Sequence, residues 1–323
     1  MNGENNTVIS WLLEGEPWVR LGALQHLLKR SADDSEVITA RKELLEHPFI
    51  TGLIAELQGW PGLTISSHKS AGQLFHKLAF AAELGLRQDD PGMPEVIAAV
   101  MMHSDVDGPF QLRSIVPEHF GGTGQETWSW ALCDAPLVLY ALARFGLSDH
   151  PAVQTGVQFL GGLVRENGWP CAVAREMGSF RGPGRKDDPC PFATLIMLRL
   201  LSAYPDLLDS HSARHGAASL LDLWEQRRER HPYIFYMGDD FCKLKYPLVW
   251  YDILHVTSVL AQFPWLAGDP RLAEMREIIR DKADGQGRYT IESAWQEGKE
   301  QEFGQKKVAL RALTLQVLRA LKD

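Results

Sequence analysis

The stretch that decides the fold is Asn167-Gly168-Trp169-Pro170, in which a polar residue and a glycine precede an aromatic residue. Two variants of it occur elsewhere in the chain, Asp107-Gly108-Pro109-Phe110 and Gln286-Gly287-Arg288-Tyr289. Their glycines stand 60 and 119 residues apart, so the second gap is two periods. Recurrence at a fixed interval is the signature of a repeat architecture, and we predict a structural unit of about 60 residues.

A second pattern keeps the same interval. Asp90-Pro91, Asp149-His150-Pro151 and Asp269-Pro270 each precede a run with helical spacing. Aspartate and proline in these places predict a helix N-cap and first turn. Both the glycine turns and the Asp-Pro caps lack one copy at this interval. We expect the missing cap near residues 207–210 and the missing turn near residues 231–233.

Apolar residues spaced by three and four predict helices between these turns. Helices of one set are apolar nearly all round, which predicts burial on both sides; they cover residues 70–85, 132–145, 192–203, 248–263 and 306–321. The alternate set has a polar face and is expected outside; it covers residues 94–103, 152–165, 212–230 and 270–283. We predict a sixth inner helix over residues 8–30 and further outer helix over 34–59, broken at Pro48.

Six inner and six outer helices predict an all-α fold, an (α/α)6 toroid of six helical hairpins around a central cavity. An open solenoid of helix pairs would show the same repeat, but its inner helices are rarely this apolar, so we favour closure. We expect one domain over residues 1–323, in which less regular helices of residues 1–60 close the ring. Residues 61–323 supply the repeats.

Composition excludes several classes of protein. Lys and Arg total 33 against 41 Asp and Glu, and this net charge of -8 disfavours nucleic acid as a partner. No apolar run approaches the ~20 residues of a membrane span, and residues 1–7 lack the features of a secretory signal. Four cysteines are too few for a disulfide framework in 323 residues. We therefore expect a cytoplasmic protein with no membrane span.

Polar residues gather where the inner helices begin. In a toroid all inner helices run the same way, so their starts share one mouth of the cavity. The residues concerned are His68, Lys69, Cys133, Asp134, Asp187, Asp188, Cys190, Tyr251, Asp252, His255, Lys306 and Lys307. Taken singly, such an aspartate is most often an N-cap and such a cysteine most often packs. Taken together, these residues could bind two kinds of ligand. Helix N-termini attract anions, and carboxylate, thiolate and imidazole groups are the ligands of zinc.

A glycine-aromatic turn before each inner helix of a six-hairpin ring resembles the terpenoid cyclase and protein prenyltransferase superfamily, from about Gly59 onward. Phe159-Leu160 before Asn167-Gly168-Trp169 is similar to its repeat, with Val164 in place of the usual glutamine. Asp188-Pro189-Cys190 resembles the Asp-x-Cys zinc-ligand segment of prenyltransferase catalytic subunits, and His255 resembles their third ligand. Arg185 matches a basic position that such enzymes use on the diphosphate, while the other is Gly182 here.

The chain also departs from this superfamily. The protonating Asp-x-Asp-Asp motif of squalene-hopene cyclases is missing. The segment Asp105-Val106-Asp107-Gly108 matches it only in part. The aspartate-rich metal-diphosphate motif of ionising terpene synthases is absent as well. Nothing in the sequence identifies the helical partner subunit that protein prenyltransferases require.

The first hypothesis for function is zinc-dependent transfer of an isoprenoid to a thiol. The resemblance implies zinc held by Asp188, Cys190 and His255, with an open position for a nucleophile. An apolar or diphosphate-bearing small molecule would be the partner, and its diphosphate would meet basic side chains. The candidates are Lys69, Arg185, Lys186 and Lys307.

Three alternatives stay open. In a metal-free cyclase, a buried carboxylic acid such as Asp134, Asp188 or Asp252 would protonate an apolar substrate; with Tyr251, Asp134 and Asp252 are the candidate catalytic residues. Six-hairpin rings also host glycosidases with paired carboxylates. A non-catalytic binding ring would need none of this chemistry. The sequence does not settle which reaction, if any, takes place.

Overall fold

The computed structural model describes residues 3–68, 70–180, 186–229, 234–295 and 301–322. Over these ranges the protein has 13 α-helices and very short strands, so its fold class is all-α as predicted. The chain forms two compact units, a central unit of residues 53–237 and a terminal unit that combines residues 1–52 with 238–323. None of the described helices has the length and apolarity that crossing a membrane requires.

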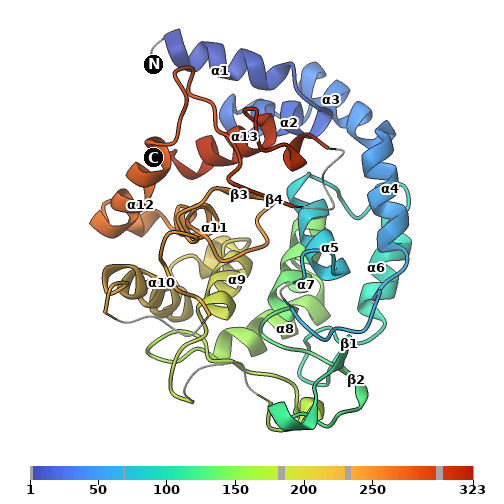
Figure 1. Ribbon diagram of the computed structural model, residues 1–323. Coiled ribbons are helices and arrows are strands. Elements are labelled where there is room, and N and C mark those ends of the chain that lie inside the picture. Colours follow the sequence, from blue (N-terminus) through green and yellow to red (C-terminus); the bar gives the residue numbers. More distant parts are fainter. Residues whose placement is uncertain (1–2, 69, 181–185, 230–233, 296–300, 323) are drawn as a thin grey trace. The chain divides into compact units, whose positions relative to one another are not determined.

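The central unit contains three of the predicted inner helices. They are α5 (Leu74–Glu83), α7 (Ala135–Leu142) and α9 (Pro191–Leu201), and α7 packs against both of the others. Every residue of α7 and of α9 is buried, which confirms that these helices are covered all round. The predicted outer helices are α6 (Met93–Met101), α8 (Pro151–Gly162) and α10 (His211–Glu225); α8 packs on α7 and α10 on α9 (Figure 1).

A buried polar network joins these three inner helices. Arg199 of α9 lies 3.1 Å from the carboxylate of Glu83 at the end of α5. The same guanidinium lies over the ring of Tyr140 of α7, 4.6 Å from its centroid, and the Tyr140 hydroxyl donates to Glu83. Burial and the Glu83 charge raise the pKa of Tyr140. Because each charge is paired, the network ties the helices together without an orphaned ion.

The Gly168 turn docks on the inner helix that follows it. Gly168 has a φ of 102°, a conformation that a residue with a side chain rarely adopts. The Trp169 N–H donates to Thr194 Oγ1 of α9 at 3.0 Å, and the Cys190 N–H donates to the Trp169 carbonyl at 2.7 Å. This turn therefore fixes the start of α9.

The Gly287 turn repeats this geometry in the terminal unit. The Tyr289 N–H donates to Thr314 Oγ1 of α13 (Arg311–Ala320) at 3.0 Å, and the Leu310 N–H donates to the Tyr289 carbonyl at 2.9 Å. Both hydroxyl acceptors stand 25 residues after their donors. The recurrence found in the sequence is thus a recurrence of structure.

The helix caps agree in part with the Asp-Pro pattern. Ser210 caps α10 and Asp269 caps α12 (Pro270–Arg280), both as predicted. The cap of α8 is His150, whose ring accepts from the Ala152 N–H, so Asp149 is not the cap. Asp90 is not a cap either. Its carboxylate accepts the Arg87 N–H at 2.7 Å and closes the preceding turn, and α6 begins at Met93 with Gly92 as its N-cap residue.

In the terminal unit the two ends of the chain pack together. Its helices are α1 (Gly3–Leu13), α2 (Pro17–Gly22), α3 (Ser35–Glu46), the first residues of α4 (Pro48–Leu57), α11 (Ile253–Leu260), α12 and α13. The last helix, α13, contacts α1, α2 and α11 (Figure 1). Arg311 donates to the Trp11 carbonyl at 2.9 Å and lies over its indole ring.

One of the two predicted N-terminal elements is wrong in its boundaries. We predicted one helix over residues 8–30, but α1 ends at Leu13 and α2 begins at Pro17, which has no N–H to continue a helix. A π-helical turn, Ala23–Leu27, follows α2. The break predicted at Pro48 is confirmed, since α3 ends at Glu46 and α4 begins at Pro48.

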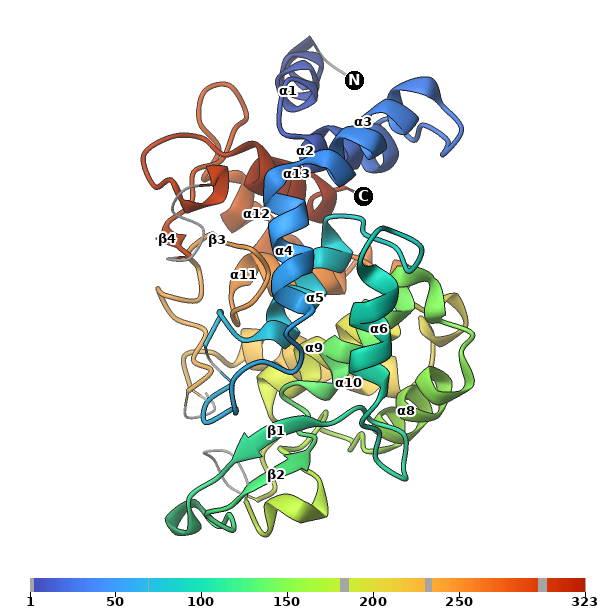
Figure 2. The same cartoon turned by 90° about the vertical axis from the view of Figure 1, so that its right-hand side faces the viewer.

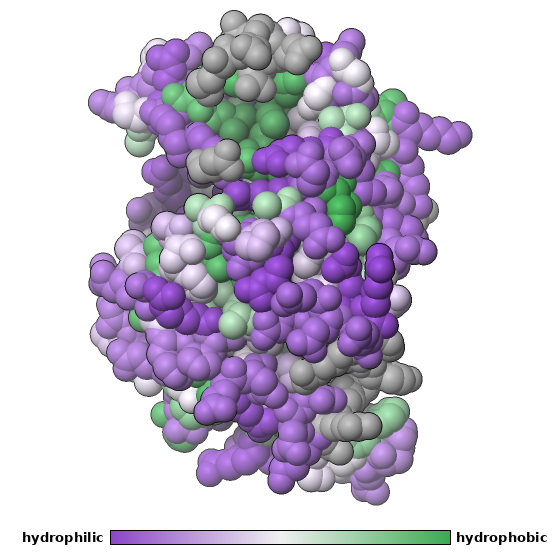
Figure 3. All heavy atoms as spheres, turned by 90° about the vertical axis from the view of Figure 1, so that its left-hand side faces the viewer, coloured by the Kyte–Doolittle hydropathy of each residue, from purple (hydrophilic) through white to green (hydrophobic). Residues whose placement is uncertain are grey.

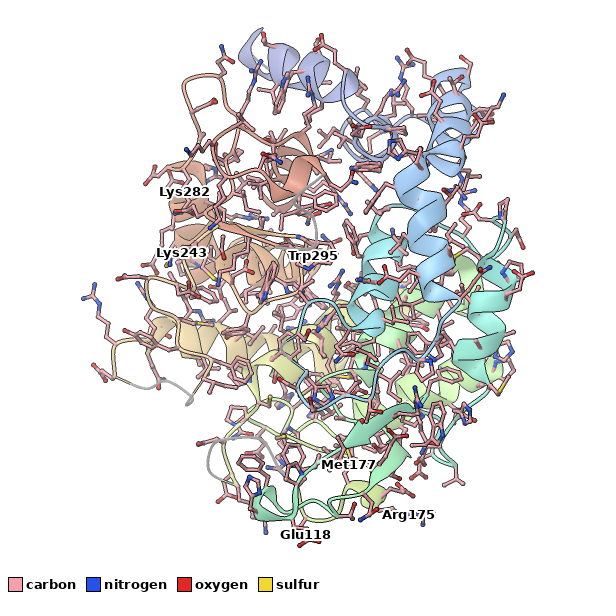
Figure 4. The ribbon with its side chains drawn as sticks, turned by 45° about the vertical axis from the view of Figure 1, so that its right-hand side comes forward. Glu118, Arg175, Met177, Lys243, Lys282 and Trp295 are labelled. Atoms are coloured by element: carbon pink, nitrogen blue, oxygen red, sulfur yellow. The ribbon has the colours of Figure 1, made fainter. Side chains whose placement is uncertain are left out.

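A β-hairpin, which the sequence analysis did not predict, belongs to the central unit. Strands β1 (Leu112–Ile115) and β2 (Glu126–Ser129) pair antiparallel (Figure 2). Glu118 lies in the connection between them, and Arg175 lies on the neighbouring 3-10 turn, which packs on β2 (Figure 4). Each strand has four residues, too few to reveal an alternating pattern.

The outer helices meet water as their polar faces predict. On α12, Leu272, Met275 and Ile279 are buried, whereas Glu274 and Glu277 are exposed. The face of the molecule that carries this helix is mostly hydrophilic (Figure 3).

Candidate functional site

Two buried aspartates mark the starts of two inner helices. Asp134 precedes α7 in the central unit, and Asp252 precedes α11 in the terminal unit. Each has no exposed surface. Both were predicted as candidate catalytic residues, and each belongs to a site built within its own unit.

The two oxygens of Asp252 have different surroundings. Oδ1 accepts the N–H groups of Leu254 and His255 at 3.0 and 3.1 Å, so it caps α11. Oδ2 is buried and has no hydrogen-bond partner within the described part of the chain. A buried carboxylate oxygen without a partner is costly, and such an atom in a native fold requires an explanation.

Burial raises the pKa of Asp252 to about 7. The hydrogen bonds that Oδ1 accepts from His255 and Leu254 and the charge of Lys245 act in the opposite direction, but burial dominates. A carboxyl group with this pKa carries its proton in a large share of the molecules near neutral pH. Asp252 therefore combines the properties of a helix cap and of a weak acid.

Ion pairs and a short parallel pairing of two strands hold the segment before Asp252 in place. Lys245 is buried, and its Nζ lies 2.7 Å from Asp240 Oδ2. Strand β3 (Lys245–Tyr246) pairs with β4 (Ser293–Ala294), and the Leu244 N–H donates to the Glu292 carboxylate at 2.7 Å. Lys282 in turn pairs with Glu292 at 2.8 Å; Figure 4 shows it on the same side of this unit as Lys243. Sequence reasoning missed Asp240 and Lys245 because no local pattern links them to Asp252.

Aromatic side chains surround the start of α11. Trp250 and Tyr251 are half-buried, and the Tyr251 ring lies 5.4 Å from that of Phe241. His255 is buried, and its Nδ1 lies 2.8 Å from the Trp250 carbonyl. A carbonyl only accepts, so Nδ1 carries a proton.

Asp134 differs from Asp252 in that both of its oxygens have partners. Oδ2 lies 2.6 Å from Nε2 of His68, and Oδ1 accepts the Ala131 N–H at 3.1 Å. The His68 carbonyl accepts from Nε2 of His76 at 3.0 Å. Burial lowers the pKa of His76 to about 3, so its ring is neutral. His68 was among the polar residues noted in the sequence, but its pairing with Asp134 was not predicted.

Two thiols lie beside this carboxylate. Cys133 and Cys190 act on each other's pKa values, and Cys190 is the N-cap residue of α9. Cys133, together with the backbone N–H groups of Ala193 and Phe192, lowers the pKa of Cys190. Cys190 and burial raise the pKa of Cys133.

The predicted zinc ligands fall in different units. Asp188 and Cys190 belong to the central unit and His255 to the terminal unit. Arg165 and Asn167 hold the segment before Asp188 by donating to its backbone carbonyls. Among the described residues, no three or more His, Cys, Asp or Glu side chains form a group that could hold a metal ion. The zinc site stays a prediction, and its ligands are not assembled within either unit.

The predicted diphosphate-binding residues are placed only in part. Lys186 is exposed in a turn before α9, and Lys307 is exposed on a bend before α13. Lys69 and Arg185 lie outside the described residues. Their joint role therefore stays a prediction.

Neither the models of known protein families nor the curated proteins contain a match for this chain.

Proposed function

We propose that the protein is an acid catalyst that protonates an apolar, isoprenoid-like substrate in the cavity of an (α/α)6 toroid. The observation that carries this proposal is the buried Oδ2 of Asp252, which has no hydrogen-bond partner among the described residues. In the protonated acid, a hydrogen on this oxygen has no acceptor among the described residues, and in the proposed reaction a carbon of the bound substrate would receive it.

The chemical step is the addition of a proton to a carbon–carbon double bond. The O–H bond of Asp252 breaks, and the alkene π electrons form a new C–H bond, leaving a carboxylate and a carbocation. A second double bond of the substrate closes a ring on this cation. Loss of a proton from carbon then ends the reaction, and the carboxylate is protonated again.

The surroundings of Asp252 suit this step. Its pKa of about 7 places the acid near neutral pH, where proton donation is most effective. The faces of aromatic rings stabilise cations, and Trp250 and Tyr251 adjoin the acid in the chain. Oδ1 keeps its two hydrogen bonds as the cap, so the carboxyl group stays oriented throughout.

Two contacts support closure of the repeats into a ring. The Gly168 turn lies against Ser219 of the outer helix α10. The Gly287 turn lies in the same way against Val8 of α1. By this comparison α1, which we predicted as the start of an inner helix, lies against the last turn as the outer helix α10 lies against the Gly168 turn.

A second candidate is the zinc-dependent transferase. It is favoured by Cys190, because Cys133 and the backbone N–H groups of Ala193 and Phe192 lower the pKa of this thiol, and zinc binds the thiolate. When bound, zinc would activate a thiol nucleophile. Asp188 and His255 would complete the predicted ligand set.

The test is product analysis after incubation with a linear polyprene such as squalene, and separately with a prenyl diphosphate and a thiol, in H2O and in D2O. The proposal predicts a cyclic isomer of the polyprene, with one added deuterium from D2O, and its loss in Asp252→Asn. Zinc-dependent release of diphosphate with a thioether product would instead establish the transferase. Equal conversion by wild type and Asp252→Asn would reject Asp252 as the acid.

A further inference from the structure

Two histidines lie one turn apart on an outer helix of the central unit. His211 is the first residue of α10, and His215 follows four positions later. Side chains with this spacing lie on the same face of a helix. The centroids of the two imidazole rings are 3.9 Å apart, and the ring planes are inclined by 34°. His211 is exposed and His215 is half-buried, so solvent reaches the pair.

We propose that His211 and His215 chelate a divalent transition-metal ion such as zinc. Imidazole nitrogens are among the ligands that Zn2+, Ni2+ and Cu2+ prefer. The proposal is independent of the proposed reaction at Asp252, because that residue belongs to the terminal unit and α10 to the central unit. It also involves none of the three zinc ligands that the sequence predicted.

A backbone hydrogen bond orients the ring of His215. Its Nδ1 lies 2.9 Å from the carbonyl oxygen of His211. A carbonyl only accepts, so Nδ1 carries a proton, and in the neutral ring the lone pair is on Nε2. Metal-binding histidines commonly donate their other N–H to a backbone carbonyl or a carboxylate, which fixes the tautomer and the direction of the ring. Nε2 is therefore the atom of His215 that binds the ion.

The ring of His211 is free to supply the second nitrogen. It contacts the ring of His215, and its nitrogens have no hydrogen-bond partner among the described residues. Zinc binds each histidine nitrogen at about 2.0–2.1 Å, so two nitrogens on one ion lie at most about 4 Å apart. Because the ring centroids are already 3.9 Å apart, rotation about side-chain bonds brings the two nitrogens to one ion without a change in the helix.

The charges near the pair determine which ions suit it. Arg214 adjoins His215 in the chain, but its guanidinium pairs with Asp209 at 2.5 Å. The dipole at the start of a helix disfavours a cation. An ion bound here therefore depends on direct bonds to nitrogen, which favours zinc or nickel over Mg2+. Groups of three or more metal-binding side chains are absent from the described residues, so water completes the coordination.

The experiment follows the histidine ring signals of the full-length protein by NMR, with 13C-labelled histidine, while ZnCl2 is added. We expect the signals of His211 and His215 to shift together with one shared zinc dependence, and MgCl2 to shift neither. His211→Gln and His215→Gln assign the signals. Each variant should also weaken zinc binding at the remaining histidine of the pair by about 10²-fold, because the chelate is lost.

Two further variants provide controls. His119 is exposed and its ring contacts Phe120, so His119→Gln should leave the zinc affinity of the pair unchanged. In the His215→Gln background, Arg214→His places a histidine three positions after His211, on the same face of α10. This second change should restore part of the lost affinity.

Two results would overturn the proposal. One is zinc binding that shifts neither His211 nor His215, which would place the ion elsewhere in the protein. The other is an unchanged zinc affinity of His215 in His211→Gln, which would show that the two rings do not share an ion. Because the main readout uses the wild type, failure of a variant to fold does not affect it.

Discussion

Asp134 and Asp252 occupy the same place on two inner helices, yet their carboxyl groups have different environments. Both precede the first helical residue and both are fully buried. Asp134 has a partner for each oxygen, the Ala131 N–H and the ring of His68. Asp252 uses Oδ1 as a cap, while Oδ2 has no hydrogen-bond partner within the described residues.

The chemistry of an aspartate directly before an inner helix therefore depends on residues that are distant in the chain. His68 stands 66 residues before Asp134. Where a partner of this kind is present, the aspartate holds the structure together. Where Oδ2 is buried without one, the pKa of the carboxyl group rises and the group becomes an acid.

The largest expected effect is on turnover. Asp252→Asn should lower the rate of product formation by about 10²–10⁴, the usual contribution of a general acid. Asparagine keeps an oxygen for the cap of α11 but does not supply the acidic proton. Asp134→Asn is the matched control and should retain most of the rate, measured with the same substrate. A rate lost in Asp134→Asn and kept in Asp252→Asn would reverse the assignment.

The next effect is on stability, where substitution of Asp134 should cost more unfolding free energy than substitution of Asp252. Asp134→Ala leaves the Ala131 N–H and the His68 ring without their partner and should cost about 2–4 kcal/mol of unfolding free energy. Asp252→Ala loses a cap worth about 0.5–2 kcal/mol, but it also removes a buried oxygen without a partner. Denaturant unfolding at neutral pH measures both values. Equal losses would show that the two carboxyl groups are equivalent in the fold.

A third difference appears in the pH dependence of stability. The folded pKa of Asp252 is about 7, above the ordinary aspartate value of about 4, so its contribution is most favourable at low pH and is lost as pH rises through the folded pKa. Relative to Asp252→Asn, the wild type should lose roughly 2–3 kcal/mol between about pH 5 and about pH 8. Unfolding curves of both proteins across this range provide the measurement. A difference that does not change with pH would mean that the carboxyl group does not titrate there.

The smallest expected effect is a change in the pKa of Asp252 when a neighbouring charge is removed. The charge of Lys245 lowers the pKa of this carboxyl, so Lys245→Met should raise it. Lys243 pairs with the same Asp240 at 3.1 Å but is itself largely exposed, so Lys243→Met is the control and should have little effect. NMR titration of the aspartate carboxyl carbons reports both. A lowered pKa in Lys245→Met would contradict the stated role of this charge.

The features predicted well from the sequence are those that depend on local spacing. The inner helices follow from apolar residues at three- and four-residue intervals, and α7 and α9 are buried as that pattern predicts. The Gly168 and Gly287 turns repeat because each needs a glycine at positive φ beside a backbone donor. The break at Pro48 follows from the missing N–H of proline.

The features that were missed depend on distant partners or on very short elements. The β1–β2 hairpin pairs strands of only four residues. The contact of His68 with Asp134 joins residues that are 66 positions apart, so it leaves no local pattern. Asp252 caps α11 as predicted, and its role as an acid stays a prediction; only its surroundings distinguish it from Asp134.

The most direct test of the account is a 13C NMR titration of the aspartate carboxyl carbons in selectively labelled wild type and Asp252→Asn. We predict one carboxyl resonance that titrates near pH 7 in the wild type and is missing in the variant. If every aspartate resonance instead titrates near the ordinary value of about 4, Asp252 is ionised at neutral pH. The proposed acid catalysis would then be wrong.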